Sequence, residues 1–94
     1  MLRRYRDRRT EQFAYGEFVK AFSGIDKTLR RRLTFVEEAK SLSALSTIPG
    51  HRFEAMQGDR QGQYSIRVND QWRICFEWPD DQTGAVSIEI VDYH

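Results

Sequence analysis

The last three residues of the sequence, Asp92, Tyr93 and His94, carry side chains that can exchange protons or contact phosphate. They follow residues 86–91, whose alternating apolar side chains predict a β-strand. A second segment, residues 58–76, places arginines among alternating apolar residues, as expected for a sheet that presents guanidinium groups to an anion. Together the two segments predict a compact site for phosphodiester chemistry.

Two arginines of the second segment, Arg67 and Arg73, are expected side by side. Alternation in residues 64–68 and 72–78, around a turn at residues 69–71, predicts a β-hairpin with one apolar side. Both arginines then emerge on the outer side, away from the helices. Arg67 is equally well interpreted as a surface residue facing water, whereas Arg73 lies between two apolar residues of a central strand and is the stronger candidate.

Proton transfer is expected from His94, because an unperturbed imidazole has a pKa of about 6.5. Asp92 would act as a partner base or hold the imidazole in one tautomer, and Tyr93 would stack on a nucleotide or bond to phosphate. A regular strand puts Asp92 and His94 on one side and Tyr93 on the other, so the three converge only if the chain bends. The assignment of acid and base stays open.

The remaining titratable residues point to no metal and no other cofactor. Cys75 is the single cysteine, which removes a disulfide framework, and its position in a strand predicts a small buried apolar residue. His51 and His94 belong to no metal-binding spacing. His51 follows Pro49 and Gly50 and is interpreted as a solvated loop histidine outside the site.

The helical signals lie in the first half of the chain. Residues 3–6 predict a short edge strand, and Asp7 or Thr10 caps a helix that runs toward Gly16. Residues 23–26 resemble a capping box, and apolar residues then recur at helical spacing through about Leu42 or Leu45. This pattern predicts one long second helix.

From residue 53 onward the apolar period changes to two, and residues 79–84 supply a further turn. We therefore predict an α+β domain spanning residues 1–94, with two N-terminal helices packed on one face of a small, mainly antiparallel β-sheet. A chain of 94 residues forms one modest core. No apolar run approaches the roughly 20 residues that cross a bilayer, and the first residues lack a signal-peptide core, so no membrane association and a cytoplasmic location are expected.

Charge is distributed unevenly along the chain. Residues 1–34 hold ten Lys or Arg against four Asp or Glu, whereas residues 35–94 hold five against ten. This asymmetry indicates a polyanionic partner, although two solvated basic helix faces explain it equally well. Charge alone therefore does not decide the function.

Three blocks of the sequence, residues 58–67, 69–76 and 91–94, together with the opening residues 5–7, 10–11 and 16, are similar to a known family. The chain resembles HigB-type toxins of bacterial type II toxin–antitoxin systems, within the RelE superfamily of ribosome-dependent messenger RNA endonucleases. The resemblance spans nearly the whole chain and implies a RelE-like fold. It also implies cleavage of messenger RNA in the ribosomal decoding site, where the 2′-hydroxyl attacks the neighbouring phosphate without a metal.

Such a reaction needs a proton acceptor, a proton donor and cationic support for the transition state. The resemblance assigns the cationic role to Arg73, whose planar guanidinium can donate two hydrogen bonds to phosphate oxygens. Arg60 and Arg67 are expected to bind the RNA backbone, and the closing residues Asp92 and His94 supply the proton chemistry.

The chain departs from some members of the family in the strand that enters the Gly-Asp-Arg motif. Those toxins have a histidine and a lysine where this chain has Glu54 and Gln57, and the resemblance places these two residues among those expected to contact RNA. Loss of a lysine removes positive charge near phosphate, and a glutamate adds repulsion unless it serves as the general base. Weaker activity is therefore expected, and a plain solvent-facing strand residue is the alternative interpretation of Glu54.

The resemblance also implies partners. They are the ribosome, messenger RNA and a HigA-like helix-turn-helix antitoxin, through which alone the toxin would meet operator DNA. Lys27 and Arg30 to Arg32 would contact ribosomal RNA, or form a solvated helix face with an Asp26–Arg30 pair. Two other functions stay open. One is a weakly catalytic or non-catalytic binding partner of the antitoxin that acts in autoregulation, and the other is a ribonuclease that cuts RNA without ribosomes.

Overall fold

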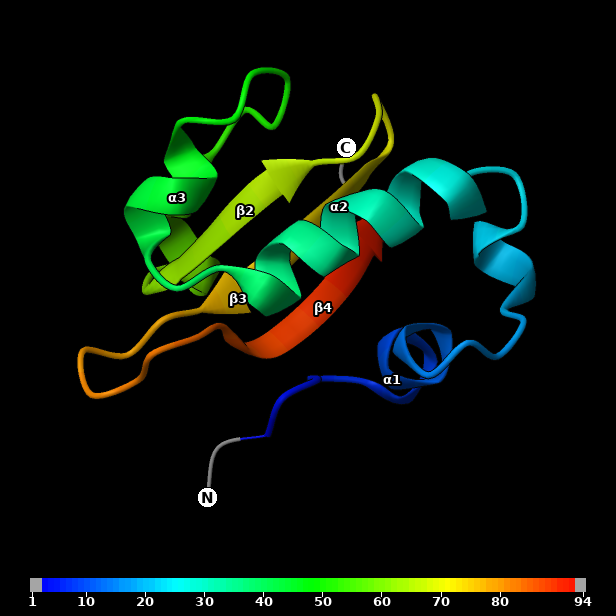
Figure 1. Ribbon diagram of the computed structural model, residues 1–94, viewed down its shortest axis with the longest axis horizontal. Coiled ribbons are helices and arrows are strands. Elements are labelled where there is room, and N and C mark those ends of the chain that lie inside the picture. Colours follow the sequence, from blue (N-terminus) through cyan, green and yellow to red (C-terminus); the bar gives the residue numbers. More distant parts are fainter. Residues whose placement is uncertain (1–2, 93–94) are drawn as a thin grey trace.

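Residues 3–92, which the computed structural model describes, form three helices and a four-stranded sheet (Figure 1). The helices are α1 (Arg8–Ala14), α2 (Asp26–Glu38) and α3 (Leu42–Ser46), with 3₁₀ turns η1 (Lys20–Phe22) and η2 (Gly58–Arg60). The strands are β1 (Glu54–Ala55), β2 (Gln63–Arg67), β3 (Trp72–Glu77) and β4 (Val86–Asp92). The predicted α+β class is confirmed.

The sheet is antiparallel throughout, in the order β1-β2-β3-β4. Ile74 in β3 lies opposite Ile66 in β2 and opposite Ile90 in β4. All three isoleucines are fully buried, so the register brings one apolar row onto one face of the sheet. The predicted hairpin between β2 and β3 is confirmed, and its turn is fixed by Asn69, whose side chain accepts hydrogen bonds from two backbone amides.

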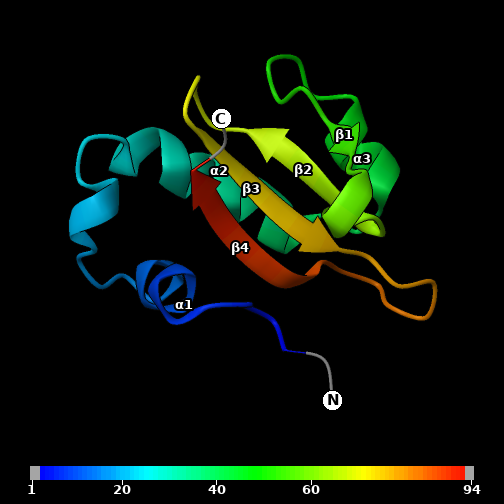
Figure 2. The ribbon, with the colours of Figure 1, turned by 180° about the vertical axis from the view of Figure 1, so that it is seen from behind.

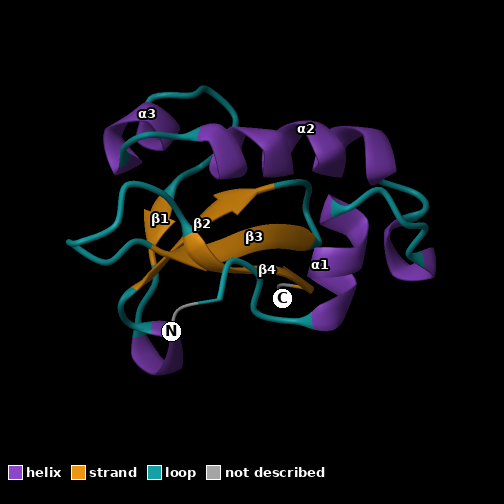
Figure 3. Cartoon of the chain, turned by 60° about the horizontal axis from the view of Figure 1, so that its bottom comes forward, coloured by secondary structure: helices purple, strands orange, loops and turns teal. Residues whose placement is uncertain are grey.

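Helix α2 covers the apolar face, and α3 continues the same layer (Figure 3). Leu29, Leu33 and Val36, at helical spacing, have no exposed surface. The opposite face of the sheet is turned away from α2 (Figure 2). That second face carries Ser65, Arg67, Arg73 and Glu89, because side chains alternate between the two faces of a strand.

The second predicted helix is two helices. Helix α2 ends at Glu38 because Ala39 is extended, with φ −64° and ψ 137°. Ser41 then starts α3 by accepting a hydrogen bond from the amide of Ala44 at 3.2 Å. The predicted capping box is wrong as well: the N-cap of α2 is Ile25, which makes no side-chain cap bond.

Helix α1 lies beside the outer edge of β4 rather than over the sheet face (Figures 1 and 2). Its N-cap is Asp7, one of the two predicted candidates, and the chain leaves the helix through Gly16 at φ +91°. The predicted edge strand at residues 3–6 is present as one parallel bridge between Tyr5 and Ile88. No helix within residues 3–92 combines the length and apolar character that a bilayer crossing needs.

Candidate active site

Arg73 lies on the sheet face opposite α2, because its neighbour Ile74 points into the core beneath α2, and Arg73 is 7% exposed. Its Nε donates to the hydroxyl oxygen of Ser65 at 3.0 Å, and its Nη2 donates to the carbonyl oxygen of Arg52 at 2.8 Å. The same Nη2 is 3.3 Å from Glu54 Oε1. A buried guanidinium is stable only when such partners replace its hydration. These contacts hold the cation in one orientation.

The predicted neighbourhood of Arg67 and Arg73 is confirmed, because the two residues lie directly opposite each other in β2 and β3. Arg73 does not emerge into water as expected. It lies over β2 toward Ser65 and β1, and this burial follows from the contacts with residues 52–54. Arg67 pairs instead with Asp70 in the hairpin turn and keeps 32% of its side chain exposed.

The carbonyl that Arg73 contacts belongs to a residue with an unusual backbone. Arg52 has φ +46°, a left-handed conformation that is uncommon outside glycine. This conformation accompanies the sharp change of direction after Pro49 and Gly50 and aims the Arg52 carbonyl at the guanidinium. Sequence reasoning did not identify Arg52, since no residue pattern marks a positive φ at an arginine.

Glu54 and Gln57 lie next to Arg73 and Arg60. The Glu54 side chain is 53% exposed, as a solvent-facing strand residue would be, and yet it is paired with Arg73. Glu54, Gln57 and Arg60 line an open cavity of about 300 Å³ together with Met56. The structure therefore brings together three residues that the sequence predicted to contact RNA.

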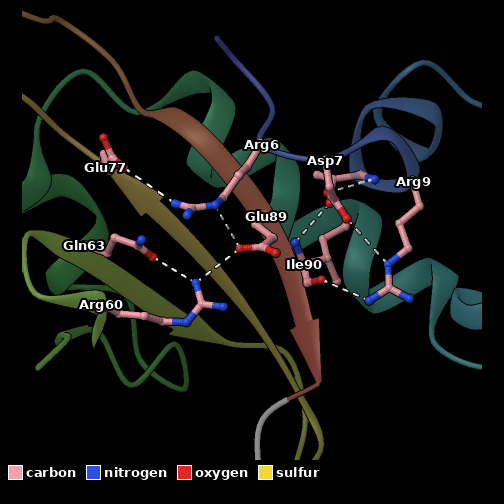
Figure 4. A network of polar contacts seen from close by, with 9 residues as sticks. Arg6, Asp7, Arg9, Arg60, Gln63, Glu77, Glu89 and Ile90 are labelled. Atoms are coloured by element: carbon pink, nitrogen blue, oxygen red, sulfur yellow. Dashed lines mark hydrogen bonds and ion pairs between the residues drawn. The ribbon is translucent and has the colours of Figure 1, made fainter. Parts of the chain in front are cut away.

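Arg60 belongs to a network on the same sheet face (Figure 4). Its Nη1 donates to Glu89 Oε1 and to Gln63 Oε1, both at 3.1 Å. Arg6 Nε lies 3.7 Å from the same Glu89 oxygen, and Arg6 Nη1 lies 3.8 Å from Glu77. Arg6 and Glu89 were not identified from the sequence, because their meeting depends on pairing between the N-terminal segment and β4.

Cys75 lies opposite Glu89 in the register and is fully buried. Burial raises the pKa of the Cys75 thiol. The prediction of a small buried apolar residue is confirmed, and nothing in this environment favours a reactive thiolate.

Each arginine of the predicted site is paired with a carboxylate within residues 3–92. Arg73 pairs with Glu54, Arg60 with Glu89 and Arg67 with Asp70. The guanidinium groups are thus well positioned, but much of their positive charge is compensated. A phosphate that binds here must compete with these carboxylates.

Asp92 ends β4 opposite Trp72, and its Oδ2 accepts a hydrogen bond from Gln71 Nε2 at 3.1 Å. The neighbouring Val91 lies opposite Arg73. Strand alternation therefore directs Asp92 to the face of Trp72, and Val91 to the face of Arg73. Tyr93 and His94, the other two predicted catalytic residues, lie outside the described residues.

His51 is not the solvated loop residue that was predicted. Only 2% of its surface is exposed, and its ring packs edge-on against Phe35 with centroids 5.2 Å apart. Burial, and then the charges of Arg32 and Arg31, lower the pKa of His51 to about 4. Its Nδ1 has no hydrogen-bond partner among the described residues. The side chain thus fills a gap between α2 and the start of β1 as a neutral ring.

Two arginines of helix α2 contact other parts of the fold. The Arg30 guanidinium lies 4.0 Å from the centre of the Phe13 ring, and Arg32 Nη1 donates to the Arg67 carbonyl at 3.4 Å. Lys27 and Arg31 are exposed. Among the side chains of residues 3–92, no three His, Cys, Asp or Glu come together in a way that could hold a metal ion.

The chain is similar to a known protein family and to two known proteins. Residues 3–94 match a family described as RelE-like toxin of type II toxin-antitoxin system HigB. The chain is 43% identical over 58 residues to Toxin HigB-1 of Vibrio cholerae, which covers 62% of this chain and 61% of that protein. It is 24% identical over 83 residues to an uncharacterized protein of Haemophilus influenzae, covering 87% and 82% of the two chains. The Vibrio match thus spans less than two thirds of that relative's length.

Proposed function

The chain belongs to the RelE-like HigB toxins of type II toxin–antitoxin systems, and on this premise we propose that it is an endoribonuclease that cuts messenger RNA in the ribosomal decoding site. The observation that carries the proposal is the buried, three-way fixed guanidinium of Arg73. The bonds to Ser65 and to the Arg52 carbonyl orient the cation before the substrate arrives, so that phosphate has to displace only the Glu54 carboxylate among these three contacts. The cytoplasm, where ribosomes translate, is the proposed location.

In the proposed reaction the RNA supplies its own nucleophile. The 2′-hydroxyl oxygen bonds to the adjacent phosphorus and loses its proton, while the bond from phosphorus to the 5′-oxygen breaks and that oxygen gains a proton. The products are a 2′,3′-cyclic phosphate and a 5′-hydroxyl. Arg73 supports the extra negative charge on the phosphoryl oxygens, since a guanidinium stays protonated at neutral pH and can donate two parallel bonds.

Proton transfer is proposed for the end of the chain. His94 has a side chain that can give or take a proton near neutral pH, and Asp92 either accepts a proton or orients the imidazole. Tyr93 is proposed to stack on a nucleotide or to bond to phosphate. Val91, directly before Asp92, lies opposite Arg73, so the end of β4 runs past the guanidinium, whereas the Asp92 side chain is directed to the other face of the sheet and would reach the phosphate only if the chain bends.

Arg60, Arg67 and Gln57 are proposed to bind the RNA backbone beside the scissile phosphate. Arg60 and Gln57 line the same open cavity, and Arg67 lies across the strands from Arg73. Phosphate would displace the carboxylate partners of these arginines. Arg31 and Lys27, exposed on α2, are proposed to contact ribosomal RNA.

The test uses purified protein, translating ribosomes and a messenger RNA of known sequence. We expect cuts within the reading frame, in phase with codons, that carry 5′-hydroxyl ends and require ribosomes. Equal cleavage of the same RNA without ribosomes would instead support the free ribonuclease, and the decoding-site proposal would be abandoned.

A second function, a poorly catalytic partner of a HigA-like helix-turn-helix antitoxin that acts in autoregulation, is favoured by one observation. Glu54, Glu89 and Asp70 compensate the charges of all three candidate arginines within the described residues. Under this alternative, expression of the chain alone would not arrest growth, and the chain would still bind operator DNA through the antitoxin. Under the main proposal it arrests growth, and the antitoxin relieves the arrest.

A further inference from the structure

The outer edge of β4 is covered by the N-terminal part of the chain. Strand β4 is the last strand of the sheet, so the peptide groups that point away from β3 need other partners. Along the first half of β4 these partners are backbone groups, because the Ile88 amide donates to Arg4 and the Ile88 carbonyl accepts from Arg6. Ile90 is the next residue whose backbone amide and carbonyl point outward.

The backbone amide and the backbone carbonyl of Ile90 are both held by side chains of α1 (Figure 4). The Ile90 amide donates to the Thr10 hydroxyl oxygen at 3.0 Å, and Thr10 is fully buried. Arg9 Nη2 donates to the Ile90 carbonyl at 3.5 Å. We name these two side chains and their bonds to Ile90 the α1 clamp.

Further contacts hold both residues of the α1 clamp, Thr10 and Arg9, in place. Asp7 accepts a hydrogen bond from the Thr10 amide at 3.4 Å and lies 3.7 Å from Arg9 Nε. The Arg9 guanidinium also lies 5.2 Å from the ring centre of Phe22 and 5.5 Å from that of Trp72. Trp72 is the residue opposite Asp92 in the sheet.

We propose that Thr10 and Arg9 are positioning residues, which hold the end of β4 beside Arg73 so that the residues after Val91 can turn toward the phosphate that Arg73 binds. This inference rests on the proposed function and extends it to α1. Strand ends at a sheet edge open more easily than strand centres. Ile90 is the last outward-pointing peptide before Asp92, so the α1 clamp acts where fraying would displace the catalytic end.

A buried threonine offers a clean test, because valine keeps its shape and removes the hydroxyl, whereas serine keeps the hydroxyl. The control is Ile88→Val, a fully buried position on the same strand that leaves the α1 clamp intact. Melting temperatures are measured for all variants, so that activity is compared at matched stability. Arg9→Met, which removes the guanidinium that donates to the Ile90 carbonyl, is measured together with these variants.

Cleavage on translating ribosomes is the first readout. Thr10→Val is expected to lower the rate at saturating ribosomes by about tenfold or more, with an unchanged half-saturating concentration, since small misplacements of reacting groups are costly. Thr10→Ser should stay within about threefold of the wild type, and Ile88→Val should cleave at the wild-type rate. Thr10→Val that cleaves as fast as Ile88→Val would overturn the positioning role.

Amide hydrogen exchange is the second readout and does not depend on activity. Thr10→Val should speed exchange at Val91, which pairs with Arg73, by about tenfold relative to Glu89, while Thr10→Ser should not. Unchanged exchange at Val91 would refute the proposal whatever the activity. If Val91 responds as expected but the wild-type protein does not cleave, the clamp on the strand stands and the proposed function is wrong.

Discussion

Mild acid is expected to destabilise the protein through His51. The folded state holds this imidazole neutral, with its pKa lowered to about 4 by burial and by Arg32 and Arg31. In the unfolded chain the imidazole has an ordinary pKa of about 6.5. The unfolded state therefore binds one more proton in this interval, so stability is fully present above pH of about 6.5 and is lost as pH falls toward about 4.

The size of the effect follows from the two pKa values. A difference of about 2.5 units, at about 1.4 kcal/mol per unit, gives at most about 3.5 kcal/mol once both states are protonated. Most domains have a total stability of about 5–15 kcal/mol, so this loss is readily measurable. Protonation would place a third positive charge beside Arg31 and Arg32, next to the Phe35 ring.

The assay is urea unfolding at a series of pH values between 7 and 4, with the wild type and His51→Leu compared at constant ionic strength. The titration of carboxylates and of His94 is common to both proteins, so the difference between their free energies of unfolding isolates His51. As pH falls from 7 to 4, we expect the free energy of unfolding of the wild type to decrease by about 2–3 kcal/mol more than that of His51→Leu. Parallel curves for the two proteins would refute the buried neutral imidazole, and His51→Gln repeats the test if leucine does not fold.

Three further outcomes are expected. Glu54→Gln should tighten RNA binding about two- to fivefold at low salt, as expected when an exposed carboxylate that competes for Arg73 is removed, and a fall in the cleavage rate with unchanged binding would instead make Glu54 the base. The Cys75 thiol, whose pKa is raised by burial, should react with iodoacetamide only when urea unfolds the protein, and rapid labelling of the folded protein would contradict its burial. Burial, followed by the hydrogen bond to Glu37, raises the pKa of Tyr5 to about 12, so stability should fall between pH of about 10 and about 12; Tyr5→Phe should remove this loss, as monitored by tyrosinate absorbance and unfolding.

The local patterns of the sequence predicted the sheet well. Alternation around residues 69–71 placed Arg67 opposite Arg73, because a tight antiparallel hairpin fixes the register of both strands. The Asp7 cap and the end of α1 near Gly16 were also predictable, since capping depends on neighbouring residues. The break of the second helix was missed because Ser41 starts a new helix within an apolar pattern that fits one helix equally well.

The partners of the site residues were much less predictable. Arg73 is buried because residues 52–54 return to the sheet and supply Glu54 and the Arg52 carbonyl, a contact across about twenty positions of the chain. His51 was misassigned for the same reason, since its burial depends on Phe35 in a distant helix. Neither contact leaves a periodic signal in the sequence.

The central claim, that the fixed guanidinium of Arg73 supports the scissile phosphate, is tested most directly by Arg73→Lys. Lysine keeps the charge but loses the planar fork, and Arg8→Lys on the exposed side of α1 is the matched control. Single-turnover cleavage on translating ribosomes is measured with proteins whose folding is verified by thermal unfolding. We expect Arg73→Lys to cleave at least about 100-fold more slowly than the wild type, and Arg8→Lys to cleave at the wild-type rate. A folded Arg73→Lys protein that cleaves at the wild-type rate would contradict the account.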